Sequence, residues 1–405
     1  MPLSFEQNWA GTFAYAAEHS PFYRELFRGM TSVPPLEHSQ TIDQRVLAER
    51  NLDFLCVPRE QVVEIVTTSG TTGNTLLWML TEADVQRLAL NERLSFECAG
   101  LTPRDTVLVA VAMDRCFIAG LAYWLGLREL GCAVARIGPA SPILALEMID
   151  RITPTVIVAV PSFLRVIAEK ARVTGFDLET CSVKKAVCIG EPIRDRQFKL
   201  NPSGRAIEEL WDAKVFSTYG VTELSNSLCE CEVGAGGHLH AEQLHIEILD
   251  DDGRQMASGE VGEIVATTFG VEAMPLIRYR TGDCAALFPA PCACGRATPR
   301  LGPIVGRKSQ KLKVKGSSLF PSTLIAVLEQ TGGVESFVIV ARKESDLSDS
   351  IEVLVNGSVS AATLRDAFQA RARTIPLIRH ASRDEIETLQ MPLQARKRRT
   401  FVDLR

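Results

Sequence analysis

The feature of the sequence that most constrains the fold is an alternation of apolar runs and amphipathic segments between residues 106 and 218. The run Thr106–Ala112 is almost continuously apolar, which is typical of a strand that is buried on both faces. A helix is predicted over Ile118–Leu130 and a further strand over Cys132–Ile137. Because strands and helices of these lengths alternate along the chain, we predict a parallel sheet with helices on both faces.

The alternation extends on both sides of these elements. Strands are predicted over Val62–Val66 and Leu76–Leu80. A helix then opens with the capping sequence Thr81–Asp84 and runs to about Ala99. Further helices are predicted over Ser141–Ile152, Phe163–Val173 and most of Ile193–Trp211, and further strands over Thr155–Val160, Ala186–Ile189 and Val215–Thr218.

The pattern changes after Val221, where predicted strands follow one another without helices between them. They cover Leu244–Leu249, Val261–Thr268 and Ala285–Phe288, and they indicate an antiparallel or barrel-like β-rich subdomain over residues 221–305. The predicted fold class is therefore α/β. A large N-terminal domain over residues 1–307, with parallel and mixed sheets covered by helices, precedes a small α+β domain over residues 308–405.

Length and composition restrict the class of protein. The chain has 405 residues, of which 46% are hydrophobic, and a formal net charge of -5. This acidic balance argues against binding to a nucleic-acid backbone, which selects basic surfaces. No apolar segment approaches the length of a membrane span, and the N-terminus lacks the features of an export signal. We therefore expect a cytoplasmic protein without nucleic-acid or membrane partners, whose 11 cysteines are thiols or metal ligands rather than disulfides.

A short loop between two apolar runs is rich in hydroxyl and glycine residues, namely Thr68, Ser69, Gly70, Thr71, Thr72 and Gly73. Glycines let backbone N–H groups approach phosphate oxygens, and hydroxyl groups donate to these oxygens or help to position Mg²⁺. The loop lacks the Gly-Lys-Ser/Thr ending of a Walker A motif. A polyphosphate site and a solvated hairpin turn are both compatible with these residues.

Four motifs in one order resemble the signature of the adenylate-forming superfamily. They are the loop Thr68–Gly73, the segment Tyr219–Glu223 (Tyr-Gly-Val-Thr-Glu), the segment Arg278–Asp283 (Arg-Tyr-Arg-Thr-Gly-Asp) and the pair Gly306-Arg307. They lie on a predicted α/β body that is followed by a small lobe. Five further stretches resemble the phenylacetate–CoA ligases of this superfamily: Phe22-Tyr23, Pro161-Ser162-Phe163, Gly190-Glu191-Pro192, Met274–Arg280 and Cys292–Arg296.

The resemblance implies a reaction in two halves. A carboxylate attacks the α-phosphate of ATP and releases pyrophosphate, and a thiol, most simply coenzyme A, then displaces AMP from the acyl-adenylate. Such a site needs cations and hydrogen-bond donors where negative charge develops. By resemblance, Thr68–Gly73 hold the β- and γ-phosphates, Thr222 contacts the α-phosphate, and Glu223 binds Mg²⁺ through a hard oxygen ligand.

The same resemblance assigns residues to the nucleoside part of ATP. Asp283 accepts hydrogen bonds from both ribose hydroxyls, and Arg307 supports the ribose-phosphate region. The segment Gly190-Glu191-Pro192 and Tyr219 flank the adenine, with the aromatic ring of Tyr219 stacked on the base. For the two acidic residues, a surface or turn position without a ligand is the structural alternative.

Two C-terminal positions are assigned by the same resemblance. In the superfamily, a lysine near the C-terminus reaches the acyl carboxylate and the α-phosphate. Aligning Val402-Asp403 with the family's Ile-Asp ending places Lys397 at that position. The family's Gly-Lys-Ala reads Arg396-Lys397-Arg398 here, and a solvated basic tail is the alternative. Ser309 stands where the family has its hinge residue, usually Asp or Lys, about which the small lobe is expected to turn between the half-reactions.

Two cysteine-containing segments indicate a metal site. Cys231 and His238 form a Cys-x6-His pair, and Cys292-Ala293-Cys294 is a Cys-x-Cys pair. Three thiolates and one imidazole suit a tetrahedral, structural Zn²⁺ site, although these spacings are not those of a standard zinc finger. Some phenylacetate–CoA ligase-like proteins carry zinc at matching positions. Cys229 or His240 as replacement ligands, and a reduced cysteine cluster without metal, are the alternatives.

An apolar pocket for the acyl group is expected beside the nucleotide, at the carboxyl ends of the parallel strands. The resemblance implies the lining residues Phe117, Gly120, Tyr123, Trp124, Ser162, Phe163 and Phe216. Their aromatic and glycine content fits a flat aromatic acid, and core packing is the alternative for each aromatic residue.

The function predicted from the sequence is an AMP-forming ligase that joins an aromatic carboxylic acid to coenzyme A, with ATP, Mg²⁺ and structural Zn²⁺. One alternative passes the acyl group to a carrier protein or an amine. Another is a non-catalytic, zinc-stabilised protein that binds nucleotide. The sequence leaves open whether the chain forms a homodimer.

Overall fold

The computed structural model describes residues 3–68, 76–314, 317–345, 348–372, 374–391 and 399–405. The chain forms two compact units, Met1–Ile304 and Val305–Arg405. The sequence predicts the domain boundary after residue 307, and the units divide after residue 304. Among the described residues, no helix combines the length and the apolar composition that crossing a bilayer requires.

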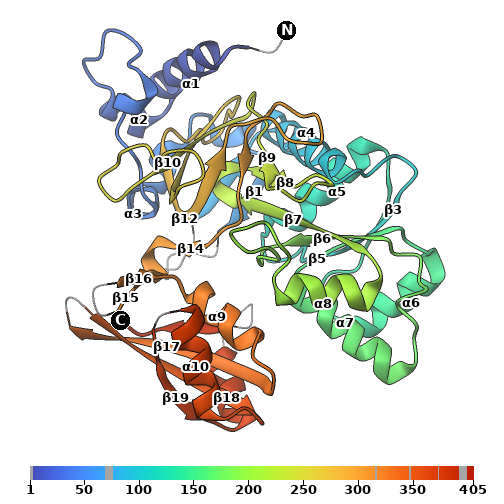
Figure 1. Cartoon of the computed structure of the whole chain (residues 1–405). Helices are drawn as coiled ribbons and strands as arrows, with labels where there is room; N and C mark the ends of the chain where they lie inside the picture. The colour runs from blue at the N-terminus through green and yellow to red at the C-terminus, as the bar shows by residue number, and fades with distance from the viewer. Residues whose placement is uncertain (1–2, 69–75, 315–316, 346–347, 373, 392–398) are drawn as a thin grey trace. The chain divides into compact units, whose positions relative to one another are not determined.

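A mostly parallel sheet forms the centre of the first unit (Figure 1). In spatial order, its strands are β4 (Ala133–Arg136), β3 (Thr106–Ala110), β5 (Val156–Ala159), β6 (Lys185–Ile189), β7 (Lys214–Val221) and β8 (Asn226–Cys229). All neighbouring pairs are parallel except β7 and β8. The α/β fold class is therefore confirmed, and the antiparallel strand β8 is the part of this sheet that the sequence pattern did not predict.

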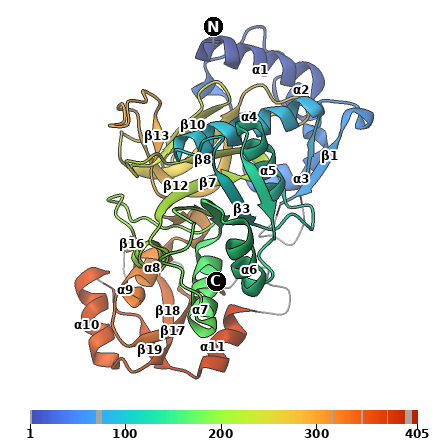
Figure 2. The same cartoon turned by 90° about the vertical axis from the view of Figure 1, so that its right-hand side faces the viewer.

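Five helices cover this sheet: α4 (Glu82–Cys98), α5 (Ile118–Leu130), α6 (Pro142–Ile152), α7 (Pro161–Thr174) and α8 (Pro202–Trp211). Successive strand residues face opposite sides and fill two separate cores. Val107 and Val109 share one core with residues of α4 and α5, and Leu108 and Ala110 share the other with residues of α6, α7 and α8. Figure 1 shows α6, α7 and α8 together on one side of the strands, and Figure 2 shows α4 passing next to β8.

Capping residues in the sequence set the ends of these helices. The hydroxyl of Thr81 accepts from the N–H of Asp84 at 3.2 Å, and the carboxylate of Asp84 accepts from the N–H of Thr81 at 3.0 Å. This capping box begins α4, as the sequence predicts. Ser141 caps α6 by accepting from the N–H of Leu144 at 3.2 Å. Gly131, with φ of 94°, ends α5 in the left-handed conformation that glycine favours.

An antiparallel sheet and the N-terminal helices complete the first unit. In spatial order, the strands are β10 (Leu244–Leu249), β11 (Val261–Thr268), β12 (Tyr279–Phe288), β13 (Arg300–Leu301) and β9 (Gly237–His238). One core joins this sheet to α1 (Phe5–His19), α2 (Pro21–Leu26), α3 (Gln44–Glu49) and the hairpin of β1 (Glu64–Thr67) and β2 (Leu77–Leu80). Within it, the buried phenol of Tyr23 accepts from the N–H of Ile277 at 2.9 Å.

The second unit is a small α+β fold. Its main sheet has the order β19 (Leu377–His380), β18 (Ser348–Gly357), β17 (Val334–Ser345) and β20 (Phe401–Asp403), and β15 (Leu312–Val314) pairs with β16 (Ser317–Leu319). Helices α9 (Pro321–Glu329) and α10 (Ala361–Arg371) share a core with Ile339 and Val353 on one face. On the other face, Ile386 of α11 (Arg383–Gln390) packs with Val338 and Leu354.

One helix predicted from the sequence is too long. The prediction covers most of Ile193–Trp211, but α8 begins only at Pro202. Before it, the carboxylate of Asp195 accepts from the N–H groups of Gln197 at 2.9 Å and Lys199 at 3.0 Å, which closes a tight turn. Phe198 has φ of 63°, a conformation that interrupts a right-handed helix. The start signal of α8 is Pro202 itself, placed after an asparagine cap.

Candidate active site and metal centre

The pair Tyr219 and Asp283 lies where the two sheets of the first unit meet. Tyr219 lies near the end of β7, and Asp283 lies within β12. The phenol of Tyr219 donates to Oδ2 of Asp283 at 3.0 Å. Burial, and then the nearby Asp283 carboxylate, raises the pKa of Tyr219 far above its ordinary value. The phenol therefore stays protonated and serves as a hydrogen-bond donor to the acid.

A second acid lies on the turn that follows Tyr219. Glu223 is buried in a short 3₁₀-helix (Thr222–Leu224) between β7 and β8. Its Oε1 is 3.5 Å from the phenol oxygen of Tyr279, the first residue of β12. Burial and the Glu223 carboxylate raise the pKa of Tyr279 above its ordinary value, so this phenol is also protonated. The structure thus brings the Tyr219–Glu223 and Arg278–Asp283 motifs together through two carboxylate–tyrosine contacts.

The glycine–hydroxyl loop is described only at its first residue. Thr68 is buried, and its N–H donates to the carbonyl of Leu76 at 3.2 Å. Ser69, Gly70, Thr71, Thr72 and Gly73 lie outside the described residues. The N–H of Thr67 donates to the carbonyl of Cys116 at 2.8 Å, which joins β1 to the loop before α5.

Three other predicted site residues lie in the C-terminal part of the chain. Arg307 belongs to β14 (Gly306–Arg307), and Ser309 to the 3₁₀-helix that follows it (Lys308–Gln310). The carbonyl of Ser309 accepts from Nη2 of Arg405 at 2.8 Å within the second unit. Lys397 lies outside the described residues. The roles of these three residues rest on the sequence motifs.

The segment Gly190–Pro192 directly follows β6. Gly190 has φ of 70°, which glycine adopts without a steric penalty. The carboxylate of Glu191 accepts from the hydroxyl of Ser162 at 2.6 Å and from its N–H at 2.9 Å. Because Ser162 is the second residue of α7, this contact satisfies an N–H group that the helix leaves unpaired. The structure thereby joins a residue assigned to the adenine site with one assigned to the acyl pocket.

The aromatic residues predicted to line the acyl pocket divide between the two faces of the central sheet. Phe117, Tyr123 and Phe216 pack in the core on the α4–α5 face, whereas Phe163 packs in the core on the α6–α8 face. The guanidinium groups of Arg128 and Arg136 both lie over the Trp124 ring, 4.8 and 4.9 Å from its centroid. The structure therefore does not gather these aromatic residues at one place.

The two small residues of the predicted pocket lie in the first turns of α5 and α7, the helices that follow the neighbouring parallel strands β3 and β5. Gly120 is buried in the first turn of α5, where a Cβ would collide with the carbonyl oxygen of Ala112. Glycine is therefore required for α5 to approach the chain segment that follows β3. Ser162 is exposed at the start of α7.

The metal ligands predicted from the sequence form a compact cluster. The ligand atoms of Cys231, His238, Cys292 and Cys294 all lie within 4.8 Å of one another. The sulfurs of Cys231 and Cys292 are 3.7 Å apart, and the Cys294 sulfur is 3.6 Å from Nε2 of His238. A tetrahedral Zn²⁺ with bonds of about 2.0–2.3 Å separates its ligand atoms by roughly 3.3–3.8 Å. The donor set and its spacing therefore fit a closed, structural zinc site.

The protonation of His238 also suits a metal ligand. Its Nδ1 is 2.9 Å from the hydroxyl of Thr298, so a proton on Nδ1 leaves the lone pair of Nε2 directed to the cluster. Burial, and then the charges of Arg296 and Arg300, lowers the pKa of His238 to about 4. The imidazole is therefore neutral at pH 7, which is the form that binds metals.

The two replacement ligands considered from the sequence have other partners. The sulfur of Cys229 accepts from the hydroxyl of Thr218 at 3.2 Å, and Nε2 of His240 is 3.3 Å from the hydroxyl of Ser95. Neither belongs to the four-residue cluster found among the described residues. The structure thus favours Cys231, His238, Cys292 and Cys294 as the ligand set.

Two residues of these sites were not singled out from the sequence. Tyr279 lies inside the Arg278–Asp283 motif, so its position in the motif was the available signal. Thr298 is a single threonine in a loop, and its contact with His238 depends on a pairing across 60 residues. Such long-range contacts leave no local pattern in one sequence.

Comparison with known proteins identifies the family of this chain. The model of the family described as AMP-binding enzyme matches residues 29–272. The phenylacetate-coenzyme A ligase of Thermus thermophilus is 31% identical over 355 residues, which are 83% of this chain and 77% of the relative. The phenylacetate-coenzyme A ligase of Escherichia coli is 29% identical over 383 residues, covering 91% of this chain and 85% of the relative.

A solved structure supports the fold. The structure of 2-hydroxyisobutyryl-CoA ligase in the postadenylation state, in complex with 2-HIB-AMP, gives a TM-score of 0.85 at 22% identity. The match covers 99% of this chain and 89% of that one. The chain therefore belongs to the AMP-binding enzyme family, as a phenylacetate–CoA ligase-like member of the adenylate-forming superfamily, and is an AMP-forming acid–CoA ligase.

Proposed function

We propose that this ligase activates an aromatic carboxylic acid and that the residues singled out above carry the reaction. The observation that carries the proposal is the convergence of Tyr219, Asp283 and Glu223 where the two sheets meet. Two carboxylates and two protonated phenols from separate motifs form a polar group within a largely apolar core. Such a polar group in an apolar surrounding suits the binding of the ribose and the metal-bound phosphates of a nucleotide.

In the first half-reaction, a carboxylate oxygen of the acid attacks the α-phosphorus of ATP. The bond from this phosphorus to the bridging oxygen breaks, and pyrophosphate leaves. Thr68–Gly73 would hold the β- and γ-phosphates, Thr222 would contact the α-phosphate, and Glu223 would hold Mg²⁺. A divalent cation supplies positive charge where negative charge develops on the transferred group.

The nucleoside would lie between the two sheets of the first unit. Asp283, already oriented by Tyr219, would accept from the ribose hydroxyls, and Arg307 would support the ribose-phosphate region. The segment Gly190–Pro192 and the ring of Tyr219 would flank the adenine. Because the Asp283 carboxylate is already oriented, less conformational entropy is lost when the ribose binds.

In the second half-reaction, the sulfur of coenzyme A attacks the acyl carbon, and AMP leaves from the same carbon. The small lobe would turn about Ser309 between the halves, and Lys397 would act only in the first. The variant Lys397→Ala should therefore abolish pyrophosphate exchange but still convert pre-formed acyl-adenylate to thioester. Equal loss of both half-reactions would contradict this role of Lys397.

The aromatic class of the acid is supported by the α4–α5 face of the central sheet. Phe117, at the start of α5, is partly buried against this core, which also contains the buried rings of Tyr123 and Phe216. The two relatives described above are named for phenylacetate, a flat arylacetic acid.

A structural Zn²⁺ ion is part of the proposal. Cys231, His238, Cys292 and Cys294 would hold it, and it would join the loop after β8 to the loop after β12. These loops follow Glu223 and Asp283, respectively, so the ion would support both acids from one side without contact with the substrate. A closed set of four protein ligands leaves no position for catalysis.

A pyrophosphate-release assay with a panel of aromatic acids, with and without coenzyme A, tests the proposal. We expect acid-dependent release of pyrophosphate and consumption of coenzyme A with at least one arylacetic or benzoic acid. Release without use of coenzyme A would instead favour transfer to a carrier protein or an amine. Failure of every acid to support ATP–pyrophosphate exchange would refute the proposed function.

A further inference from the structure

A buried ion pair outside the assigned nucleotide residues links two parts of the first unit. Nε and Nη2 of Arg194 donate to the two carboxylate oxygens of Glu230 at 2.6 and 2.7 Å. The side chains are 13% and 1% exposed, respectively. The two parallel hydrogen bonds fix the direction as well as the distance of the contact.

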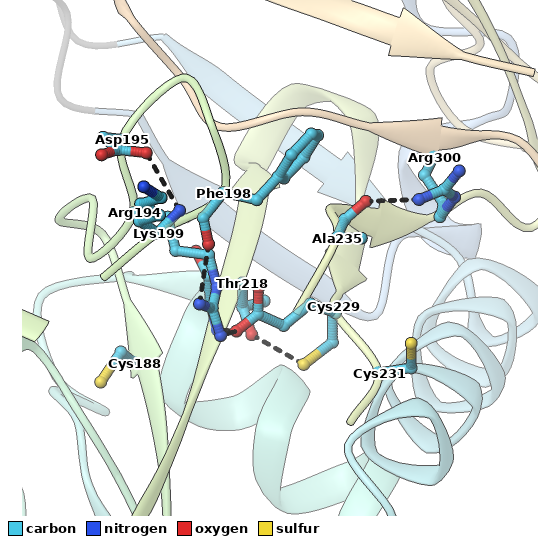
Figure 3. Close-up of polar contacts among 12 residues, drawn as sticks. Cys188, Arg194, Asp195, Phe198, Lys199, Thr218, Cys229, Cys231, Ala235 and Arg300 are labelled. Atoms are coloured by element: carbon cyan, nitrogen blue, oxygen red, sulfur yellow. Dashed lines mark hydrogen bonds and ion pairs between the residues drawn. The ribbon is translucent and has the colours of Figure 1, made fainter. Parts of the chain in front are cut away.

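Arg194 also holds the turn that follows the segment Gly190–Pro192. Its Nη1 donates to the carbonyl of Phe198 at 3.0 Å (Figure 3). Across from it, Gly234 has φ of 67°, and a Cβ there would lie 2.5 Å from Nη2 of Arg194. The glycine therefore leaves the space that the guanidinium occupies beside the loop between Cys231 and His238.

Glu230 connects this guanidinium to β7. Its Oε1 accepts from the N–H of Ser217 at 2.8 Å, and its own N–H donates to the carbonyl of Ser217 at 3.1 Å. Ser217 lies two residues before Tyr219 on the same strand. One carboxylate therefore binds the strand that carries Tyr219 and the arginine that follows Gly190–Pro192.

The turn after Gly190–Pro192 has two more anchors. The ring of Phe198 packs edge-on against Phe288 of β12, with ring centroids 5.1 Å apart. The side-chain amide of Asn201 donates to the carbonyl of Pro192 at 2.8 Å. The turn is therefore tied to both sheets that meet at Tyr219 and Asp283.

Both charges of a buried ion pair lose their hydration. For this reason, such a pair often stabilises a fold less than apolar side chains of the same volume do. The two parallel hydrogen bonds of this pair form in only one relative arrangement of the guanidinium and the carboxylate. We propose that Arg194 and Glu230 are a positioning pair, which holds the segment Gly190–Pro192 against the end of β7 at the separation that the adenine requires. The inference rests on the proposed nucleotide site and adds two residues that no motif marks.

The variant Glu230→Gln tests the pair, because it keeps the size of the side chain and an acceptor for Ser217 but removes the charge. A matched control is Glu247→Gln on β10. Glu247 forms a similarly buried, two-bonded pair with Arg278 at 2.8 and 2.9 Å. For both variants, carboxylate-dependent ATP–pyrophosphate exchange gives KM for ATP and for the acid, calorimetry gives AMP affinity, and thermal unfolding gives stability.

We expect Glu230→Gln to raise KM for ATP and the dissociation constant of AMP about tenfold, as misplaced binding groups do. KM for the acid should change less than about twofold. Glu247→Gln should lower the thermal unfolding midpoint about as much as Glu230→Gln does. It should leave KM for ATP within about twofold of the wild-type value.

If Glu230→Gln lowers stability like the control but leaves KM for ATP and AMP affinity unchanged, the positioning role is refuted and the proposed function stands. A wild-type protein that shows neither exchange nor AMP binding would overturn both. If Glu230→Gln does not fold, Arg194→Lys replaces it, since lysine keeps the charge but cannot make two parallel bonds. Its KM for ATP should rise about threefold or more, and an unchanged value would refute the pair's role.

Discussion

The phenol oxygen of Tyr219 lies 3.0 Å from Oδ2 of Asp283, and this hydrogen bond joins β7 of the parallel sheet to β12 of the antiparallel sheet. The contact fixes the rotation of the Asp283 carboxylate before any ligand binds. It also places an aromatic ring beside the acid. The ribose and adenine assignments therefore depend on each other, and a change at Tyr219 should affect both.

The variant Tyr219→Phe should raise KM for ATP about tenfold, because a hydrogen bond to a charged group contributes about 1.5 kcal/mol or more. The ring remains, so the loss reports on the orientation of Asp283 and not on stacking. ATP–pyrophosphate exchange measures the effect. Tyr15→Phe is the control, since the Tyr15 phenol donates to the carbonyl of Glu272 at 2.9 Å on the surface. Equal KM values for ATP in the two variants would contradict the assignment of Asp283 and Tyr219 to the nucleotide site.

Elemental analysis should find one zinc per chain in protein purified without chelator. Cys231→Ser should lose this metal, because a serine hydroxyl is a poor zinc ligand at neutral pH. The control is Cys181→Ser, since Cys181 is only partly buried and lies outside the four-residue cluster. Zinc retained in Cys231→Ser, or absent from the wild-type protein, would contradict the ligand set.

The buried Glu92 of α4 should make stability depend on pH. It is 3% exposed and accepts from the hydroxyl of Ser227 at 2.7 Å. Burial raises the pKa of Glu92 to about 8. This folded-state pKa exceeds the unfolded value of about 4.3, so protonation of Glu92 in the folded state contributes its full stabilisation below about pH 4.3. This stabilisation decreases as pH rises above that point and is lost as pH passes through 8. Tyr123 and Cys229, which face the carboxylate, are neutral over this range because their pKa values are also raised.

Urea unfolding between pH 5 and pH 8 tests this expectation. The unfolding free energy of the wild-type protein should fall relative to that of Glu92→Gln by up to about 1.4 kcal/mol per pH unit. Glu82→Gln, on the exposed side of the same helix, should follow the wild-type curve. Parallel curves for the wild-type protein and Glu92→Gln would show that Glu92 is ionised in the folded state.

The contact between Glu191 and Ser162 should affect both stability and acid binding. The variant Glu191→Ala removes the acceptor for the N–H of Ser162 and should cost about 0.5–2 kcal/mol of unfolding free energy, as loss of a helix cap does. It should also raise KM for the acid severalfold, because the start of α7 loses its anchor. Ser141→Ala, which removes the cap of α6, should cost stability alone. If KM for the acid is unchanged in both variants, Glu191 acts only as a helix cap and has no role in acid binding.

Much of the fold could be predicted from single residues and local periodicity. The bounds Ile118–Leu130 of α5 agree with the prediction, because an apolar face precedes the left-handed Gly131. The two-residue strands β9 and β13 could not be predicted, since they are too short to show any period. The overlong helix before Trp211 has a similar cause: the turn of Asp195 and Phe198 uses side-chain hydrogen bonds that compete with a helix.

The sites were predicted less evenly. The four predicted metal ligands follow from residue type and resemblance, and the structure places their ligand atoms within 4.8 Å of one another. The contacts of Asp283 with Tyr219 and of Glu223 with Tyr279 depend on how two sheets meet, which no local pattern encodes. The ion pair of Arg194 and Glu230 was missed for the same reason.

The proposed metal site has a consequence for how the chain folds. Its ligands lie on both sides of the segment that folds into β10, β11 and β12, so an ion bound by all four closes the loop from His238 to Cys292. Such a closure holds the two ends of this segment together in the folded chain, as a disulfide would, yet it requires no oxidant. All eleven cysteines of this protein are among the described residues, and none of them forms a disulfide. The complete cross-link could form only after Cys294 has been synthesised, which would make metal capture a late checkpoint in the assembly of the first unit.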